Sequence, residues 1–205
     1  RALQLKPDDA EAHNILGFAL VKQGRWPEAI LHYERALQLK PDLTVAHANL
    51  GKALAQQGQW AEAILHYERA LRINPDDAGV FFNLGNALAQ QGRWPAAIQN
   101  YERALQLQPD SAEAGCNLAW LLATCRDAPF RNPAEALRRA QRACDLTHSR
   151  NPVVLDTMAA AQAAGGDFVQ AVATAKEALA LATAGGKERL AREIERRLAL
   201  YQAGQ

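Results

Sequence analysis

The chain has 205 residues, of which 49% are hydrophobic, enough apolar material for a folded protein of one large or two small domains. Its 23 Lys and Arg residues almost balance its 22 Asp and Glu residues, so the net charge of +1 provides no field that would attract nucleic acid or an anionic membrane surface. No stretch approaches the roughly 18 consecutive apolar residues that a membrane span requires. The sequence therefore predicts neither a nucleic-acid partner nor membrane insertion.

The first residues, Arg1–Asp9, read RALQLKPDD, and almost the same segment returns at Arg35–Leu43 as RALQLKPDL. This repetition predicts that residues 1–9 are the end of a repeat that begins upstream. We therefore expect the chain to be a fragment, and its first residue carries no information about a targeting segment.

Prolines mark an internal repeat. Pro7, Pro41, Pro75 and Pro109 follow one another at intervals of 34 residues. The segments at residues 10–43 and 44–77 are identical at 21 of 34 positions, which indicates duplication rather than shared helical composition.

Each unit has the pattern of two amphipathic helices, predicted in the first unit at Ala10–Gln23 and Pro27–Leu39. Glycine is predicted to end the first helix in a left-handed conformation, and proline to end the second. The glycines are Gly24, Gly58 and Gly92, and the prolines are Pro41, Pro75 and Pro109. Each unit is therefore predicted to be a helical hairpin.

These units closely resemble the tetratricopeptide repeat family, and in particular the repeats of bacterial members and of O-linked N-acetylglucosamine transferases. The resemblance rests on one set of positions in the three units: Leu16, Gly17, Leu20, Ala29, Tyr33, Ala36 and Pro41; Leu50, Gly51, Leu54, Ala63, Tyr67, Ala70 and Pro75; and Leu84, Gly85, Leu88, Ala97, Tyr101, Ala104 and Pro109. The family's usual first-helix Trp is replaced by His13, His47 and Phe81. The resemblance implies an all-α, right-handed α-solenoid of tandem helix-turn-helix hairpins.

The pattern weakens after residue 111 but continues. The expected alanine at position 131 appears as Ala136, which predicts a lengthened turn of about five extra residues. The predicted segments are residues 1–9, the end of a truncated repeat; 10–43, 44–77 and 78–111, three regular repeats; 112–151, a degenerate repeat with the lengthened turn; 152–185, a second degenerate repeat; and 186–205, a capping helix.

The capping helix is predicted at Lys187–Tyr201. Leu190, Ile194 and Leu198 form its apolar stripe. Its polar outer face is predicted to carry Arg189, Arg192, Glu193, Arg196 and Arg197.

No catalytic, cofactor or metal motif is present. His13 and His47 occupy one repeat position and His32 and His66 another, so duplication accounts for them, and packing or surface roles are favoured over metal ligation. The cysteines Cys116, Cys125 and Cys144 are odd in number and lack CxxC spacing, which argues against a disulfide framework and favours a reducing, cytoplasmic compartment. The sequence thus predicts a protein that is not an enzyme.

By analogy with the family, a partner segment is expected in a concave groove formed by the first helices of the hairpins. Asn49, Asn83 and Asn117 share one repeat position, where their amides could bind a peptide backbone at regular intervals or could serve a structural purpose. The other groove residues named from the sequence are Ile15, Phe18, Lys22, Ala48, Lys52, Gln56, Phe82, Asn86, Gln90, Cys116 and Trp120. The Lys, Asn and Arg set with which chaperone-binding members hold a terminal carboxylate is not reproduced, so binding of a chaperone tail is disfavoured.

Three functions remain open: a protein-interaction scaffold that binds an extended segment, the substrate-recognition arm of a larger glycosyltransferase-like enzyme, and a self-assembling module that associates through its repeat ends. A basic segment with Arg126, Arg131, Arg138, Arg139, Arg142 and Arg150 is expected to be a solvated face, or else part of a site for an acidic partner.

Overall fold

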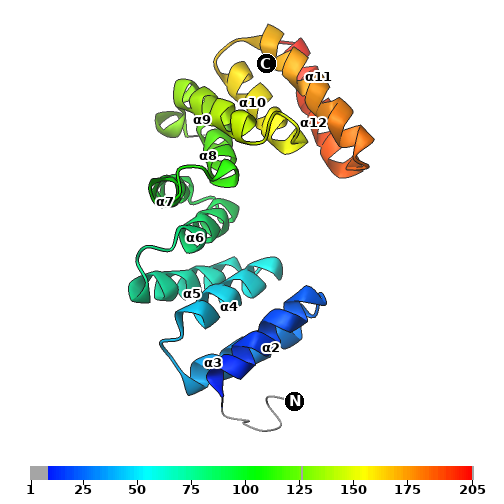
Figure 1. The fold of residues 1–205 in the computed structure, drawn as a ribbon. Coiled ribbons are helices and arrows are strands. Elements are labelled where there is room, and N and C mark those ends of the chain that lie inside the picture. Colours follow the sequence, from blue (N-terminus) through cyan, green and yellow to red (C-terminus); the bar gives the residue numbers. More distant parts are fainter. Residues whose placement is uncertain (1–8, 126, 205) are drawn as a thin grey trace. The chain divides into compact units, whose positions relative to one another are not determined.

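The structure is a computed structural model that describes residues 9–125 and 127–204. Every regular element in these ranges is a helix, which confirms the all-α prediction. The elements, labelled as in Figure 1, are α2 Ala10–Lys22, α3 Trp26–Leu39, α4 Thr44–Gln56, α5 Trp60–Ile73, α6 Ala78–Gln90, α7 Trp94–Leu107, α8 Ala112–Thr124, the 3₁₀ turn η1 Ala128–Phe130, α9 Pro133–Leu146, α10 Pro152–Ala164, α11 Phe168–Ala184 and α12 Glu188–Gln202.

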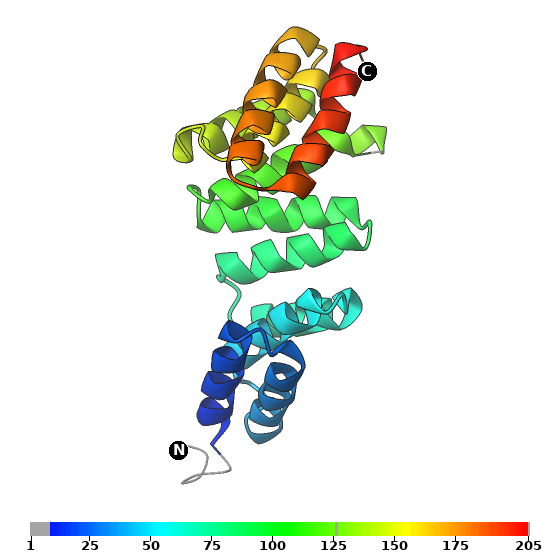
Figure 2. The same cartoon turned by 90° about the vertical axis from the view of Figure 1, so that its right-hand side faces the viewer.

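Consecutive helices pack in pairs, as predicted for tandem hairpins. The pairs are α2 with α3, α4 with α5, α6 with α7, α8 with α9, and α10 with α11 (Figures 1 and 2). The chain forms two compact units that meet in sequence between Leu107 and Gln108. The N-terminal unit contains α2–α7 and the C-terminal unit contains α8–α12. The predicted end of a preceding repeat, residues 1–9, lies outside the described residues except for Asp9.

Glycines and capping aspartates mark the ends of several helices. Gly24, Gly58 and Gly92 follow the first helices with φ of 74°, 75° and 72°, a conformation that costs glycine little because it has no Cβ. At the other end, the Asp9 carboxylate accepts the backbone N–H groups of Glu11 and Ala12 at the start of α2, and that of Asp77 accepts from Val80 at the start of α6.

The close approach of the two helices in a regular hairpin depends on one glycine and one tyrosine. Tyr33, Tyr67 and Tyr101 are almost fully buried. Each ring lies over the glycine of its own hairpin, Gly17, Gly51 or Gly85, where a side chain would collide with it. Alanines that are fully buried, such as Ala29 and Ala63, complete this packing.

The connection from α8 to α9 is longer than the connections within the regular hairpins and contains η1. It is tied to the preceding helix, because the backbone N–H of Asn132 donates to the carbonyl of Leu122 at 3.0 Å. Asn132 then caps α9 by accepting the N–H of Glu135.

The last helix, α12, packs on α11 and also contacts α10. Ile194 is fully buried and Tyr201 nearly so, whereas Leu190 and Leu198 of the predicted stripe are only half-buried. Arg197, which was predicted to lie on the outer face, points inward instead. Only 22% of its side chain is exposed, and it pairs with the buried Asp156. The prediction was wrong for this residue because a polar residue was assumed to face solvent.

Candidate functional site

The first helices of the N-terminal unit lie side by side, α2 next to α4 and α4 next to α6 (Figure 1). We call their shared surface the first-helix face of the N-terminal unit. Its predicted binding residues differ in exposure. Phe18, Lys22, Lys52 and Gln90 are exposed, while Asn49, Phe82, Asn83 and Asn86 are half-buried.

At the α2 end of this face, apolar side chains reach solvent. Ile15 is 67% exposed and Phe18 is 49% exposed. The ammonium nitrogen of Lys22 lies 5.2 Å from the centre of the Phe18 ring, a cation–π arrangement that holds the long side chain over the aromatic face. Within the described residues, neither Lys22 nor Lys52 forms an ion pair, so both keep their charge available on this face.

Two of the predicted amides already bind protein groups. The side-chain nitrogen of Asn49 donates to the side-chain oxygen of Asn14 at 3.0 Å, which links the first helices of two neighbouring repeats. The oxygen of Asn86 accepts the hydroxyl of Tyr101 at 2.7 Å, so this residue supports the buried tyrosine. Asn49 retains its carbonyl oxygen and a second N–H for a ligand, since an amide has two donors and two acceptor lone pairs.

In the C-terminal unit, α8 lies beside α10 and carries Asn117 and Trp120, both half-buried. The expectation that Cys116 belongs to the binding surface is wrong. Its thiol is buried and lies 3.1 Å from the Thr157 hydroxyl, because α10 covers that side of α8. Burial raises the pKa of the Cys116 thiol, which keeps it in the unreactive protonated form.

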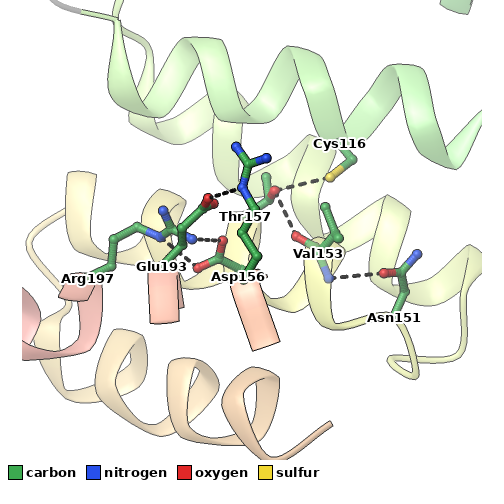
Figure 3. Close-up of polar contacts among 8 residues, drawn as sticks. Cys116, Asn151, Val153, Asp156, Thr157, Glu193 and Arg197 are labelled. Atoms are coloured by element: carbon green, nitrogen blue, oxygen red, sulfur yellow. Dashed lines mark hydrogen bonds and ion pairs between the residues drawn. The ribbon is translucent and has the colours of Figure 1, made fainter. Parts of the chain in front are cut away.

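A polar cluster that the sequence did not predict joins α12 to α10 and α8 (Figure 3). The Arg197 guanidinium donates to both carboxylate oxygens of Asp156, at 2.9 and 2.5 Å, and lies 5.1 Å from the centre of the Trp120 ring. Burial raises the pKa of the Asp156 carboxyl, while the hydrogen bonds and charge of Arg197 oppose that rise. The last helix therefore contributes a cation that covers part of the Trp120 ring.

Two histidine pairs are a second arrangement that the sequence did not predict. The Nδ1 atoms of His13 and His32 are 2.9 Å apart, and those of His47 and His66 are 3.0 Å apart. Burial, followed by the charge of His47, lowers the pKa of His66 to about 4, and burial is also the main cause of the lowered pKa of His47 and of His32. In the sequence, the repeat makes histidines 34 positions apart equivalent, such as His13 and His47. In the structure, the histidines in contact are 19 positions apart, on the two helices of one hairpin.

Ion pairs neutralise much of the positive charge of the basic segment between Arg126 and Arg150. Arg138 and Arg139 both pair with Glu135, and Arg142 pairs with Asp110. Arg126 lies outside the described residues. These ion pairs favour the solvated-face interpretation over a strongly basic site.

A surface cavity of about 1100 Å³ lies between α9, the end of α10 and the start of α11. Arg138 and Arg142 line it, together with the apolar side chains of Leu137 and Met158. Gln162 also lines it, and its buried side-chain oxygen has no hydrogen-bond partner among the described residues. This cavity is a second surface on which a ligand could rest.

No cluster of three or more His, Cys, Asp or Glu side chains close enough to hold a metal occurs among residues 9–125 and 127–204. Over the same residues, no helix is both long and apolar enough to cross a bilayer.

Comparisons with known proteins agree with the hairpin architecture. The family model described as TPR repeat matches residues 19–58, 51–92 and 85–123, which together span just over half of the chain. No curated protein sequence matches the chain.

Solved structures show the same fold. YrrB, described as a TPR protein with an unusual peptide-binding site, is 19% identical, with 95% of this chain and 96% of that chain covered and a TM-score of 0.74. A thermophilic TPR protein of Thermus thermophilus is 18% identical, with 95% and 99% covered and a TM-score of 0.65. The first TPR of Spaghetti (RPAP3), solved with the HSP90 peptide SRMEEVD, is 26% identical, with 54% and 87% covered and a TM-score of 0.53.

Proposed function

The chain belongs to the tetratricopeptide repeat family, and we propose that it is a protein-interaction scaffold that binds an extended peptide segment of a partner. The proposed binding surface is the first-helix face of the N-terminal unit. The proposal assigns no catalytic step to the chain. One of the comparisons that support it is the peptide-bound TPR of Spaghetti, although the residues that hold a chaperone-tail carboxylate are not reproduced here.

The observation that carries the proposal is the exposure of large apolar side chains beside polar side chains on one face. Ile15 and Phe18 expose much of their apolar surface to water. Hydration of apolar surface is unfavourable, so a ligand that covers these side chains would gain free energy. The amides of Asn49 and Asn83 follow on the next two first helices, where they can bind peptide backbone groups without requiring particular ligand side chains. Apolar anchors and backbone-reading amides are the two components that an extended peptide needs.

Asn117 extends this proposal to the C-terminal unit, where its amide occupies the same repeat position. There Arg197 covers part of the neighbouring Trp120 ring. We therefore assign the main contribution to the N-terminal unit, and a supporting contribution to Asn117. The remaining proposed contacts are Lys22, Lys52, Phe82, Asn86, Gln90 and Trp120.

The test starts by selecting peptides on the full chain from a random peptide library and measuring the affinity of a selected peptide by calorimetry. A single Asn83→Ala change should weaken binding about two- to tenfold, since a hydrogen bond contributes about 0.5–1.5 kcal/mol net. The triple change Asn49→Ala, Asn83→Ala and Asn117→Ala should almost abolish it while circular dichroism stays helical.

Gln99→Ala is the matched control, because Gln99 is an exposed amide on α7, a second helix. This variant should bind as tightly as the wild type. If the folded triple variant keeps wild-type affinity, the first-helix face is not the binding surface, and the cavity lined by Arg138 and Arg142 becomes the next to test. If the triple variant unfolds, the three amides are structural.

A further inference from the structure

The surface cavity of about 1100 Å³ lies entirely within the C-terminal unit. Helix α9 forms one wall, and the end of α10 with the start of α11 forms the other; α9 packs on α10 (Figure 1). The lining residues of α9 extend from Ala134 to Asp145, which is about 17 Å along the helix axis. An extended peptide rises about 3.3 Å per residue, so a segment of about five residues matches this length.

The inner surface of the cavity is apolar. Met158 and Ala161 of α10 are buried and line it, and Leu137 of α9 lines it with 40% of its surface exposed. Apolar side chains of a ligand that cover Leu137 and touch Met158 would remove apolar surface from water on both molecules. The cavity therefore favours a ligand with apolar side chains.

Gln162 adds a polar requirement. Its amide lines the cavity, and its side-chain oxygen is buried without a hydrogen-bond partner among the described residues. The terminal amide of glutamine rotates over a broad range about its last side-chain bond, so this oxygen can turn toward the cavity and accept a hydrogen bond there. A peptide backbone offers an N–H group for that bond, whereas the tail of a fatty acid does not. A peptide segment is thus the better match.

Two guanidinium groups stand one helical turn apart on the α9 wall, those of Arg138 and Arg142. Arg138 pairs with Glu135, and Arg142 donates to Asp110 at 2.6 Å. Both arginine side chains are mostly exposed, and ion pairs in water contribute little stability. Each guanidinium has five N–H donors, so both can also bind a carboxylate of a ligand.

The carboxylates of the cavity wall are already bound by donors of their own helices. Asp145 accepts from the side-chain nitrogen of Gln141 at 2.9 Å. Asp167 accepts from the backbone N–H of Gln170 at 3.0 Å, at the start of α11. The groups with unused hydrogen-bonding capacity on this wall are therefore the two guanidinium groups, and they favour an acidic ligand.

We propose that this cavity binds a short extended segment of a partner protein in which apolar and acidic side chains alternate. Successive side chains of an extended segment point to opposite faces. The apolar side chains would lie on Leu137 and Met158, and the carboxylates would remain at the rim beside Arg138 and Arg142. This second docking surface is independent of the first-helix face of the N-terminal unit.

The test uses Met158, the only methionine of the sequence, as a reporter inside the cavity. The full chain is labelled with ¹³C at the methionine methyl group and titrated with the acetylated and amidated peptide Glu-Leu-Glu-Leu-Glu. The methyl signal should move and saturate at millimolar peptide. The peptides Lys-Leu-Lys-Leu-Lys and Glu-Ala-Glu-Ala-Glu should each bind about tenfold more weakly or less, because they lack the acidic or the large apolar side chains.

The double variant Arg138→Glu, Arg142→Glu should reverse the charge preference and bind the Lys peptide more tightly than the Glu peptide. Arg196→Glu is the matched control, because Arg196 is exposed on α12 and does not line the cavity. It should bind as the wild type does. The triple variant Asn49→Ala, Asn83→Ala and Asn117→Ala should also keep the Met158 response, since these residues lie on the first helices.

Three results would overturn the proposal. The first is a Met158 signal that does not move at millimolar Glu peptide, and the second is an equal affinity of the wild type for the Glu and Lys peptides. The third is a charge-reversed variant that retains the wild-type preference. A signal that moves with protein concentration alone would show that a second copy of the chain fills the cavity, which also contradicts an acidic partner segment.

Discussion

The position that a Cβ atom would occupy on Gly51 lies 2.7 Å from Cε1 of Tyr67, inside the contact distance of two carbon atoms. Tyr67 is almost fully buried, so its ring has nowhere to move. Gly17 with Tyr33 and Gly85 with Tyr101 show the same relationship. The glycine therefore sets how closely the two helices of each regular hairpin approach.

Gly51→Ala should destabilise the protein. Overpacking costs about 1–3 kcal/mol, more than the gain of about 0.5–1 kcal/mol that alanine brings to a helix interior. Urea denaturation should show a lower midpoint. Gly115→Ala is the matched control, since its Cβ would lie 3.8 Å from the nearest atom, the carbonyl oxygen of Arg139, and this variant should be as stable as the wild type or more so. Equal midpoints for the two variants would contradict the steric argument.

Replacing Arg197 by Met should destabilise the C-terminal unit by about 3–5 kcal/mol at pH 7.5, because the Asp156 carboxylate would stay buried without its partner. The change also removes the interaction that opposes the burial-driven rise in the pKa of Asp156, so that pKa should rise further. A protonated carboxyl needs no counter-ion, and the loss of stability should therefore be smaller at pH 5 than at pH 7.5.

The double variant Asp156→Leu, Arg197→Met serves as the control for this ion pair. The apolar pair leaves no buried charge. The free energy of unfolding of the double variant should therefore return to near the wild-type value, without the pH dependence expected for Arg197→Met. Denaturation curves at the two pH values measure both effects. An Arg197→Met variant that loses the same stability at both pH values would show that the buried carboxylate is not the cause.

Acidification should destabilise the N-terminal unit through His66. The folded-state pKa of about 4 is below the usual value of 6.5, so between these values the folded chain binds fewer protons than the unfolded chain. The contribution of neutral His66 to the free energy of unfolding is therefore complete above about pH 6.5 and is lost as the pH falls toward 4. Thermal melts over this range should show a smaller decline for His66→Asn than for the wild type, and His148→Asn should follow the wild type.

The burial of Ile194 predicts that α12 stabilises the unit it closes. Ile194→Ala should cost about 2–5 kcal/mol because the side chain is fully buried, whereas Leu200→Ala on the same helix should cost less than about 0.5 kcal/mol because Leu200 is 49% exposed. Deletion of residues 187–205 should lower both the melting temperature and the solubility, since it uncovers the apolar surface of α11. An unchanged melting temperature after the deletion would show that α12 is not a cap.

The sequence alone determined the repeat, the helices and their limits, because each depends on signals that lie close together in the chain. A 34-residue period, glycines with positive φ and prolines after the second helices specify a hairpin without reference to the rest of the molecule. The pairing of small glycines with large tyrosines could be read in the same way, since it is repeated three times within single hairpins.

Only the tertiary structure decided which polar side chains meet. Asp156 and Arg197 are 41 positions apart, and Asn49 bonds to Asn14 rather than pointing wholly to solvent. Polar residues on a helix look alike in sequence whether they face water or a neighbouring helix, because hydrophobic periodicity identifies the apolar stripe but not the partner of a charge beside it. The histidine pairs and the partly covered Trp120 became visible only once the packing of the helices fixed which side chains face one another.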